Sequence, residues 1–263
     1  TSIFLRESNM SIPIINLSNL SGSNGFSLRS AEMAGNAGDV NGDGFYDVVV
    51  GGLFSTGYVV FGKSSNSDAQ LDLANLDGAN GFRMLSDSGY VGKVSSIGDV
   101  NGDGFDDIIM DGVFYSRSGY ESDAYSYVVF GKTSGFDSSV DVRNVDGQIG
   151  FAIRYPGDEL DLVTPSSAGD VNGDGFGDVI LGSNKGRSFV IFGKASGFPD
   201  TFVLRDALDG NNGFSIVDAA GSNEFFSMNS AGDVNGDGFD DLIIAAPSAD
   251  RNGLNSGSSY IVF

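Results

Sequence analysis

The sequence predicts an all-β protein assembled from four copies of one unit with about four short strands. Three observations predict this class: the string GDVNGDGF occurs four times, short β-branched and aromatic runs follow each copy, and Gly and Phe are abundant. The 263 residues include 40 Gly and 21 Phe but no Trp. Such a composition is typical of short strands joined by tight turns.

Each unit contains the same features in the same order. A Gly-Phe pair precedes the acidic string, in which the first acidic residue is Asp39, Asp99, Asp170 or Asp233. An apolar run follows at 48–50, 108–110, 179–181 and 242–244, and then an aromatic strand at 58–61, 127–130, 189–192 and 260–263. Alternating segments at 71–76, 140–145 and 201–206 are predicted to be outer strands with one polar face.

Repeated four-stranded units indicate the blades of a β-propeller, stacked around an axis. A lone unit of about 65 residues cannot bury both faces, so each blade is expected to pack against its neighbours. We therefore predict one domain over 1–263 with repeats at 21–76, 77–145, 146–206 and 207–263. The alternatives are a β-solenoid and a string of separate small domains.

Closure of the ring is a separate question. Residues 2–5 and 13–20 resemble a third strand and an outer strand, and the sequence finishes on a third strand, 260–263. A ring closes if residues 1–20 complete the last blade. The same count of strands fits a segment of a larger array, and a start at Thr1 without Met suggests a processed product or an excised segment.

The acidic loop has the pattern D-x-N-x-D-G-x-x-D, which places oxygen ligands at positions 1, 3, 5 and 9. Glycine at position 6 permits the tight curl that lets these oxygens converge on one ion, and position 7 is expected to add a backbone carbonyl. The predicted ligands are Asp39, Asn41, Asp43, Phe45 and Asp47 in the first loop; Asp99, Asn101, Asp103, Phe105 and Asp107 in the second; Asp170, Asn172, Asp174, Phe176 and Asp178 in the third; and Asp233, Asn235, Asp237, Phe239 and Asp241 in the fourth.

Calcium is the ion that this set of ligands favours. All the ligands are hard oxygens, and the sequence has no Cys or His, which disfavours Zn²⁺ and copper. An EF-hand would need Glu at position 12, where the chain has Val50, Met110, Leu181 and Ile244. The plainer reading is that Asp, Asn and Gly only make polar turns. Four ions of charge +2 would reduce the formal charge of −21 to −13, so metal binding is expected to stabilise the fold.

Composition also excludes several classes of protein. A net charge of −21 makes nucleic acid an unfavourable partner. The absence of Cys and His removes thiol nucleophiles, disulfides and the commonest general base. No apolar run approaches the ~20 residues that cross a bilayer, so direct membrane insertion is not expected.

The acidic string followed by an apolar strand and an aromatic strand ending in Phe-Gly resembles the FG-GAP repeat of integrin α-subunit propellers, with closest likeness to bacterial and cyanobacterial-type secreted repeat proteins. The resemblance implies a β-propeller, a structural Ca²⁺ between the first and second strands of each blade, and an extracellular, secreted or cell-surface module for adhesion to a protein or glycan. Integrin-like propellers have seven blades, whereas this chain has four repeats. It is then a four-bladed ring, a partial array that pairs with another copy, or part of a larger chain.

The resemblance also places ligands on the face opposite the acidic loops. There the segment 111–126 carries Tyr115, Arg117, Tyr120 and Tyr125, a combination enriched at recognition surfaces, although an ordinary surface loop is the simpler interpretation. We do not expect an enzyme. A polysaccharide-active or phosphodiester-cleaving rival would rest on Asp158, Glu159 and Asp161, the acidic cluster outside the loops. A third hypothesis is a structural module of an envelope layer or filament, since unpaired strand edges invite partner strands.

Overall fold

The computed structural model describes residues 16–29, 31–52, 56–64, 69–86, 90–113, 124–155, 163–183, 187–204, 208–217, 227–247, 249 and 256–263. In these residues the protein is almost entirely β-structure, with three short 3-10 turns, η1 (Leu17–Asn19), η2 (Leu73–Asn75) and η3 (Val142–Asn144). None of the helices in this described part is long and apolar enough to cross a membrane.

Four sheets each contain one of the four acidic loops, and we number them as blades in chain order. The fourth strand of each of the first three blades begins at the Gly-Phe pair of the next predicted repeat, so the sheets cross the repeat boundaries predicted from the sequence. The first blade has β2 (Ala31–Gly38), β3 (Asp47–Gly52), β4 (Thr56–Val60) and β6 (Gly81–Leu85); the second has β7 (Tyr90–Gly98), β8 (Asp107–Val113), β9 (Ala124–Val129) and β11 (Gly150–Tyr155); the third has β12 (Val163–Gly169), β13 (Asp178–Ser183), β14 (Arg187–Ile191) and β16 (Gly213–Val217); and the fourth has β17 (Ser227–Gly232), β18 (Asp241–Ala246) and β19 (Ser258–Val262). All these neighbours pair antiparallel. The all-β, blade-like architecture predicted from the repeat is confirmed.

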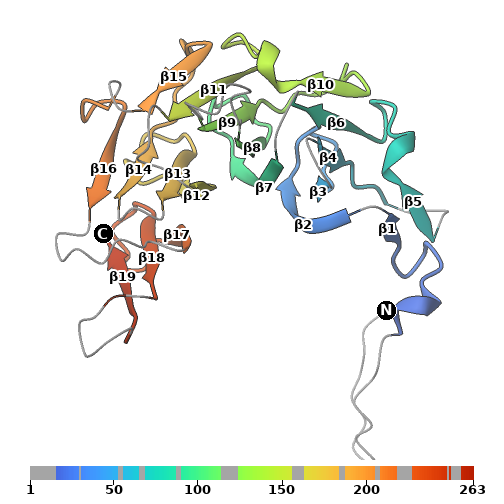
Figure 1. Cartoon of the computed structure of the whole chain (residues 1–263), viewed down its shortest axis with the longest axis horizontal. Coiled ribbons are helices and arrows are strands. Elements are labelled where there is room, and N and C mark those ends of the chain that lie inside the picture. Colours follow the sequence, from blue (N-terminus) through green and yellow to red (C-terminus); the bar gives the residue numbers. More distant parts are fainter. Residues whose placement is uncertain are drawn as a thin grey trace, which may run out of the picture.

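The blades follow one another along an open arch (Figure 1). The first strands β2, β7, β12 and β17 line its inner side and contact one another in order, as strands around a propeller axis do. A two-stranded sheet, β1 (Ser27–Arg29) with β5 (Gln70–Asp72), stands at one foot of the arch, and the fourth blade stands at the other. The described strands therefore do not close into the ring that the strand count allowed.

The alternating segments behave differently from the prediction. Only their first residues are strands, namely β5, β10 (Ser139–Asp141) and β15 (Thr201–Val203), and η2 and η3 follow two of them directly. Each pairs parallel with the fourth strand of the preceding unit: β5 with β1, β10 with β6, and β15 with β11. Between the third and fourth strands of a blade, the chain therefore forms a short edge strand on the preceding sheet. This edge strand links neighbouring sheets.

Apolar side chains from facing blades form the core. Between the first and second blades, Val49, Val59 and Phe82 meet Met110 and Val129, all nearly inaccessible to solvent. Equivalent clusters lie between the second and third blades and between the third and fourth. Strand residues that face successive blades alternate, so both faces of an interior blade are buried.

Aromatic rings add a second layer of contact at two of these interfaces. The ring of Phe82 stacks on that of Phe136 from the second blade, with centroids 4.8 Å apart and planes 6° from parallel, and Phe61 tilts against both. Phe130, Phe151 and Phe198 repeat the arrangement one blade further along. The third blade shows only the pair Phe192 and Phe214 in the described residues.

Candidate metal centre

The four acidic loops connect the first and second strands of the four blades, and their hydrogen bonds are nearly identical. In the first loop Asp39 accepts the N–H groups of Asp43 and Gly44, at 3.0 and 2.9 Å. The side chain of Asn41 also accepts the Asp43 N–H, and Asp43 accepts the N–H of Phe45. The same bonds recur in the other three loops, so each loop curls around its own polar side chains.

The aspartate at position 9 begins the second strand and points into the protein. In the second loop Asp107 is completely buried, and its two carboxylate oxygens accept the N–H groups of Val100 and Gly131, each at 2.8 Å. Asp47 and Asp178 make the matching pair of bonds. This carboxylate thereby joins the acidic loop to the glycine that follows the third strand.

Asp241 differs from the other three. Its Oδ2 accepts the N–H of Val234 at 2.8 Å, but its Oδ1 is buried without a hydrogen-bond partner among the described residues. In the other three loops this oxygen accepts the N–H of the glycine that comes directly after the phenylalanine of the third strand.

Burial makes the carboxyl groups of Asp47, Asp107 and Asp178 hard to ionise. The pKa of Asp47 is raised to about 6 and that of Asp178 to about 7, mainly by desolvation, and the charges at positions 5 and 1 of the same loop raise both further. The pKa of Asp107 is also raised well above its usual value by burial. Backbone N–H donors oppose the shift. In the first three loops, the negative charges at positions 1 and 5 therefore disfavour ionisation of the aspartate at position 9.

The donor set fits a hard divalent cation. Each loop places two carboxylates and one amide oxygen in a single tight turn and a third carboxylate at the start of the following strand. The glycines at positions 4 and 6 of the turn lie in the left-handed region, for example Gly42 at φ 68° and Gly44 at φ 88°. In the described part of the chain, however, no three acidic side chains are already converged as a metal site. The oxygens of positions 1, 3 and 5 are turned toward backbone N–H groups and toward each other, so an ion would compete with those bonds.

Successive loops are also bonded to each other. The residue at position 8 donates its N–H to the position-1 carbonyl of the preceding loop, from Asp106 to Asp39, from Gly177 to Asp99 and from Asp240 to Asp170, at 2.8–3.2 Å. The phenylalanine at position 7 packs over the position-4 glycine of the preceding loop. An ordered loop therefore helps to hold the neighbouring loop in its conformation.

Gly102 tests this contact between loops. A Cβ on Gly102 would lie 2.3 Å from the ring of Phe176, whereas one on Gly236, at the same loop position, meets nothing within 4 Å. Both glycines have positive φ, so Ala strains both backbones by similar amounts. We expect Gly102→Ala to lower the free energy of unfolding by about 1–3 kcal/mol more than Gly236→Ala, measured by denaturant unfolding. Equal losses would contradict the packing of one loop on the next.

One buried carboxyl group outside the acidic loops was not predicted from the sequence. Asp111 in β8 is almost fully buried, opposite Ser126 of β9, whose hydroxyl lies 2.9 Å from that of Tyr155. Desolvation raises the pKa of Asp111 to about 7. The equivalent residues of the other blades are Gly51, Gly182 and Ala245. The sign in the sequence that this position differs was therefore an Asp where the other repeats have Gly or Ala.

The buried Asp111 makes stability depend on pH. The folded pKa exceeds the unfolded value near 3.9, so folding favours the protonated form, and stability falls as pH rises from about 4 through 7. Asp111→Asn removes that ionisation. We expect it to raise the free energy of unfolding by about 1–3 kcal/mol at pH 8 and to change it little at pH 4. Chemical unfolding at both pH values measures the difference, and an equal effect at both would disprove the assignment.

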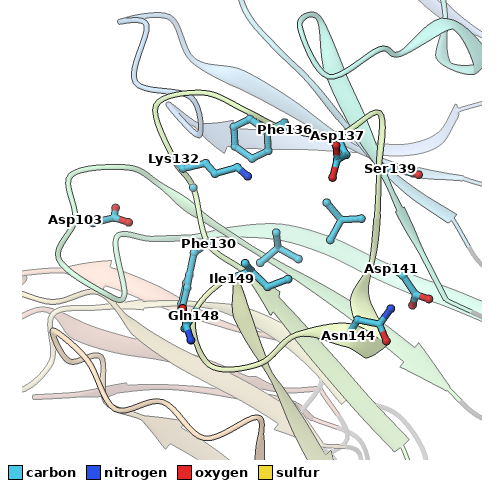
Figure 2. Close-up of a pocket in the computed structure, with 13 residues that line it drawn as sticks. Asp103, Phe130, Lys132, Phe136, Asp137, Ser139, Asp141, Asn144, Gln148 and Ile149 are labelled. Atoms are coloured by element: carbon cyan, nitrogen blue, oxygen red, sulfur yellow. The ribbon is translucent and has the colours of Figure 1, made fainter.

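A shallow hollow of about 350 Å³ lies beside the second blade (Figure 2). Lys132, Phe136 and Asp137 from the segment after β9 border it, together with Asn144 of η3 and Gln148. The Lys132 ammonium lies 4.9 Å from the centre of the Phe136 ring and donates to the Gly135 carbonyl. The Lys132 ammonium group therefore already makes contacts within the protein.

Several predicted recognition residues lie outside the described residues. These are Tyr115, Arg117 and Tyr120 of the proposed ligand face, and Asp158, Glu159 and Asp161 of the rival catalytic cluster. Tyr125 is described: it lies in β9 with its ring stacked on that of Tyr127, at 6.0 Å between centroids.

Comparison with known proteins defines the class. Residues 229–262 match the FG-GAP repeat family. Integrin alpha pat-2 of Caenorhabditis elegans is 29% identical over 228 residues, covering 80% of this chain and 17% of that protein. Integrin alpha-8 of Gallus gallus is 26% identical over 231 residues, covering 82% of this chain and 20% of that protein. The crystal structure of BBS1N in complex with ARL6DN has a TM-score of 0.41 at 9% identity, over 82% of this chain and 46% of that one.

These matches and the repeated sheets together show an FG-GAP repeat protein of the β-propeller type. The chain spans about a fifth or less of the length of the two integrin α subunits that it matches.

Proposed function

We propose that the protein is a calcium-binding extracellular module that adheres to a protein or glycan, with calcium in a structural role. The observation that carries the proposal is the fourfold repetition of one acidic loop with the same hydrogen bonds. In the first three of these loops the carboxylates at positions 1 and 5 raise the pKa of the buried aspartate at position 9. The likeness to integrin α chains supports an adhesive role at the cell surface or in a secreted protein.

Asp, Asn and Asp at positions 1, 3 and 5, the carbonyl at position 7 and Asp at position 9 of each loop would hold the ion. Bound calcium supplies positive charge that stabilises the ionised carboxylates. The residues of the chain do the rest: the position-9 aspartate anchors the loop to the strands beneath it, and the contacts between loops align successive blades. We therefore expect calcium to stiffen the inter-blade surface and not to contact the ligand.

Asp103→Ala separates calcium binding from ordinary loop stability. Asp103 is exposed and holds the N–H of Phe105, and it supplies one predicted ligand. We expect the variant to lose about 2–3 kcal/mol in saturating calcium, the linkage energy of one site at 100 times its Kd, and about 1 kcal/mol or less in chelator. Thermal melting in both buffers measures this. Asp137→Ala, at an exposed loop aspartate outside the acidic loops, serves as the control, and equal losses of Asp103→Ala in both buffers would count against the site.

The proposal includes no catalytic role. Incubation with polysaccharides and with phosphodiester substrates, with and without calcium, should release no product, while solid-phase binding to glycan and matrix-protein panels should detect a calcium-dependent ligand. Substrate turnover by the purified chain would replace the adhesive proposal with the enzymatic one.

A further inference from the structure

The side chain at position 8 of an acidic loop contacts the loop before it. Asp106 occupies this position in the second loop, and its Oδ2 accepts the N–H of Asp39 at 2.7 Å. The Asp106 N–H donates in return to the Asp39 carbonyl at 3.2 Å. Asp39 supplies the position-1 carboxylate of the first loop. One side chain of the second loop therefore holds the backbone of a predicted ligand in the first.

The fourth loop repeats this contact with the third. The Asp240 Oδ2 accepts the N–H of Asp170 at 2.9 Å, and the Asp240 N–H donates to the Asp170 carbonyl at 3.0 Å. Both position-8 carboxylates also lie over the glycine that precedes position 1. A Cβ on Gly38 or on Gly169 would be 2.1 Å from the nearer carboxylate oxygen. Two pairs of loops thus share one arrangement, in which an aspartate lies directly beside the backbone of the preceding loop.

The third loop lacks this side chain. Its position 8 is Gly177, which donates its N–H to the Asp99 carbonyl at 2.8 Å but has no carboxylate that could accept the Asp99 N–H. A Cβ on Gly98, the glycine before position 1 of the second loop, would meet no described atom within 4 Å. The space that Asp106 and Asp240 fill beside the first and third loops is therefore open beside the second.

A carboxylate in this place affects a cation site in two ways. Its hydrogen bond fixes the backbone at position 1, which lowers the conformational freedom that the loop loses when its oxygens gather around an ion. Its negative charge adds to the charges of the three carboxylates in the preceding loop, and calcium affinity rises with ligand charge and with rigidity of the site. A unit charge about 6–10 Å from a divalent cation in water changes the affinity about four- to tenfold.

We propose that Asp106 and Asp240 are positioning residues for the cation sites of the preceding loops, the first and the third. Each acts through the position-1 aspartate that it holds and is not itself a ligand. The second loop lacks this contribution because the loop after it has Gly177. The inference rests on the proposed calcium-binding role of the loops, and it assigns part of the affinity of one loop to a side chain of the next.

Asp106→Asn removes the charge and keeps an oxygen that can accept the Asp39 N–H. In about 10 mM NaCl we expect it to weaken calcium binding about three- to tenfold. Competition with a chromophoric chelator measures this as the product of the macroscopic binding constants. In about 1 M NaCl, where the screening length is about 3 Å, the effect should fall below about twofold. Asp106→Ala also removes the acceptor, so its loss should exceed that of Asp106→Asn at both salt concentrations.

Asp72→Asn is the matched control. Asp72 is an exposed aspartate outside the acidic loops, and it also accepts a backbone N–H, that of Ala74. Its substitution should change calcium binding much less than Asp106→Asn does. In chelator, Asp106→Asn should unfold at the same urea concentration as the unchanged chain or slightly above it, because a negative charge beside the carboxylates has been removed. Lower stability in chelator with unchanged calcium affinity would make Asp106 merely structural and would overturn the proposal.

A double-mutant cycle shows on which loop Asp106 acts. Asp43→Ala removes a predicted ligand from the first loop, and Asp103→Ala removes the equivalent ligand from the second. In the Asp103→Ala chain, Asp106→Asn should keep its full effect on the remaining sites. In the Asp43→Ala chain it should have little effect. The reverse result would show that Asp106 serves its own loop, contrary to the proposal.

Gly177→Asp supplies the missing carboxylate beside the second loop. Gly177 lies outside the left-handed region, and a Cβ there would be 3.0 Å from the Ile97 carbonyl oxygen, which needs to move by a few tenths of an ångström. Gly177→Asn has the same shape without the charge. We expect the Asp variant to bind calcium about three- to tenfold more tightly than the Asn variant, and this gain should vanish in the Asp103→Ala chain. Equal affinities of the two variants would contradict the proposal.

The unchanged chain distinguishes failure of this inference from failure of the proposed function. If the unchanged chain binds no calcium, the calcium role and the inference fail together. If it binds calcium, and neither Asp106→Asn nor Gly177→Asp differs from its matched control at low salt, the loops remain calcium sites and only the inference fails.

Discussion

Phe82→Ala is expected to lower the free energy of unfolding by about 3–5 kcal/mol. The side chain is completely buried between the first and second blades, and its ring stacks on Phe136 and tilts against Phe61. Truncation removes these contacts and leaves a cavity that rigid strands on both sides cannot refill. Urea unfolding followed by circular dichroism measures the loss.

Phe214→Ala provides the matched control for Phe82. It occupies the same place in its blade, but it is only partly buried and one neighbouring ring, Phe192, contacts it in the described residues. We expect its loss to be smaller by about 1–2 kcal/mol. If the two variants lose the same free energy, the stacked rings between blades contribute nothing beyond the burial of one side chain.

Asp107→Ala is expected to cost about 3–5 kcal/mol even in chelator. The substitution leaves the N–H groups of Val100 and Gly131 buried without an acceptor, at about 1–3 kcal/mol each. In calcium the loss should be larger, because the variant also lacks one predicted ligand. Thermal and urea unfolding in both buffers distinguish the two contributions.

Asp107→Asn retains one acceptor oxygen and the shape of the side chain. In chelator it should recover part of the stability lost in the alanine variant. In calcium it should remain weakened, since an amide is a poorer ligand than a carboxylate for this ion. If Asp107→Ala is neutral in chelator, the buried aspartate does not hold loop and strands together.

The repeat made most of the fold predictable. The aromatic run predicted at 127–130 lies at the end of β9, and the apolar run 108–110 lies within β8. Local patterns of this kind depend on neighbouring residues, which the sequence displays directly. The parallel pairing of β5, β10 and β15 with the preceding unit was not predictable, because a parallel partner is chosen by non-local packing.

The candidate site shows the same division. The spacing of oxygens within a loop could be read from nine residues, and the structure gives those residues one shared conformation in four loops. The hydrogen bond from the Gly131 N–H to the buried Asp107 could not be predicted from the sequence, and neither could the packing of Phe176 over Gly102. Each contact joins residues that only the folded blades bring together. Asp111 escaped notice for a related reason: its burial depends on β9 and β11, not on its neighbours in sequence.

A calcium titration by isothermal calorimetry, on protein freed of metal, tests the central claim most directly. Four repeated loops predict four calcium ions bound per chain, with a thermal midpoint that rises in calcium and falls again in EDTA, and with weaker binding of magnesium. No heat of binding, together with the same melting temperature in calcium and in EDTA, would contradict the account.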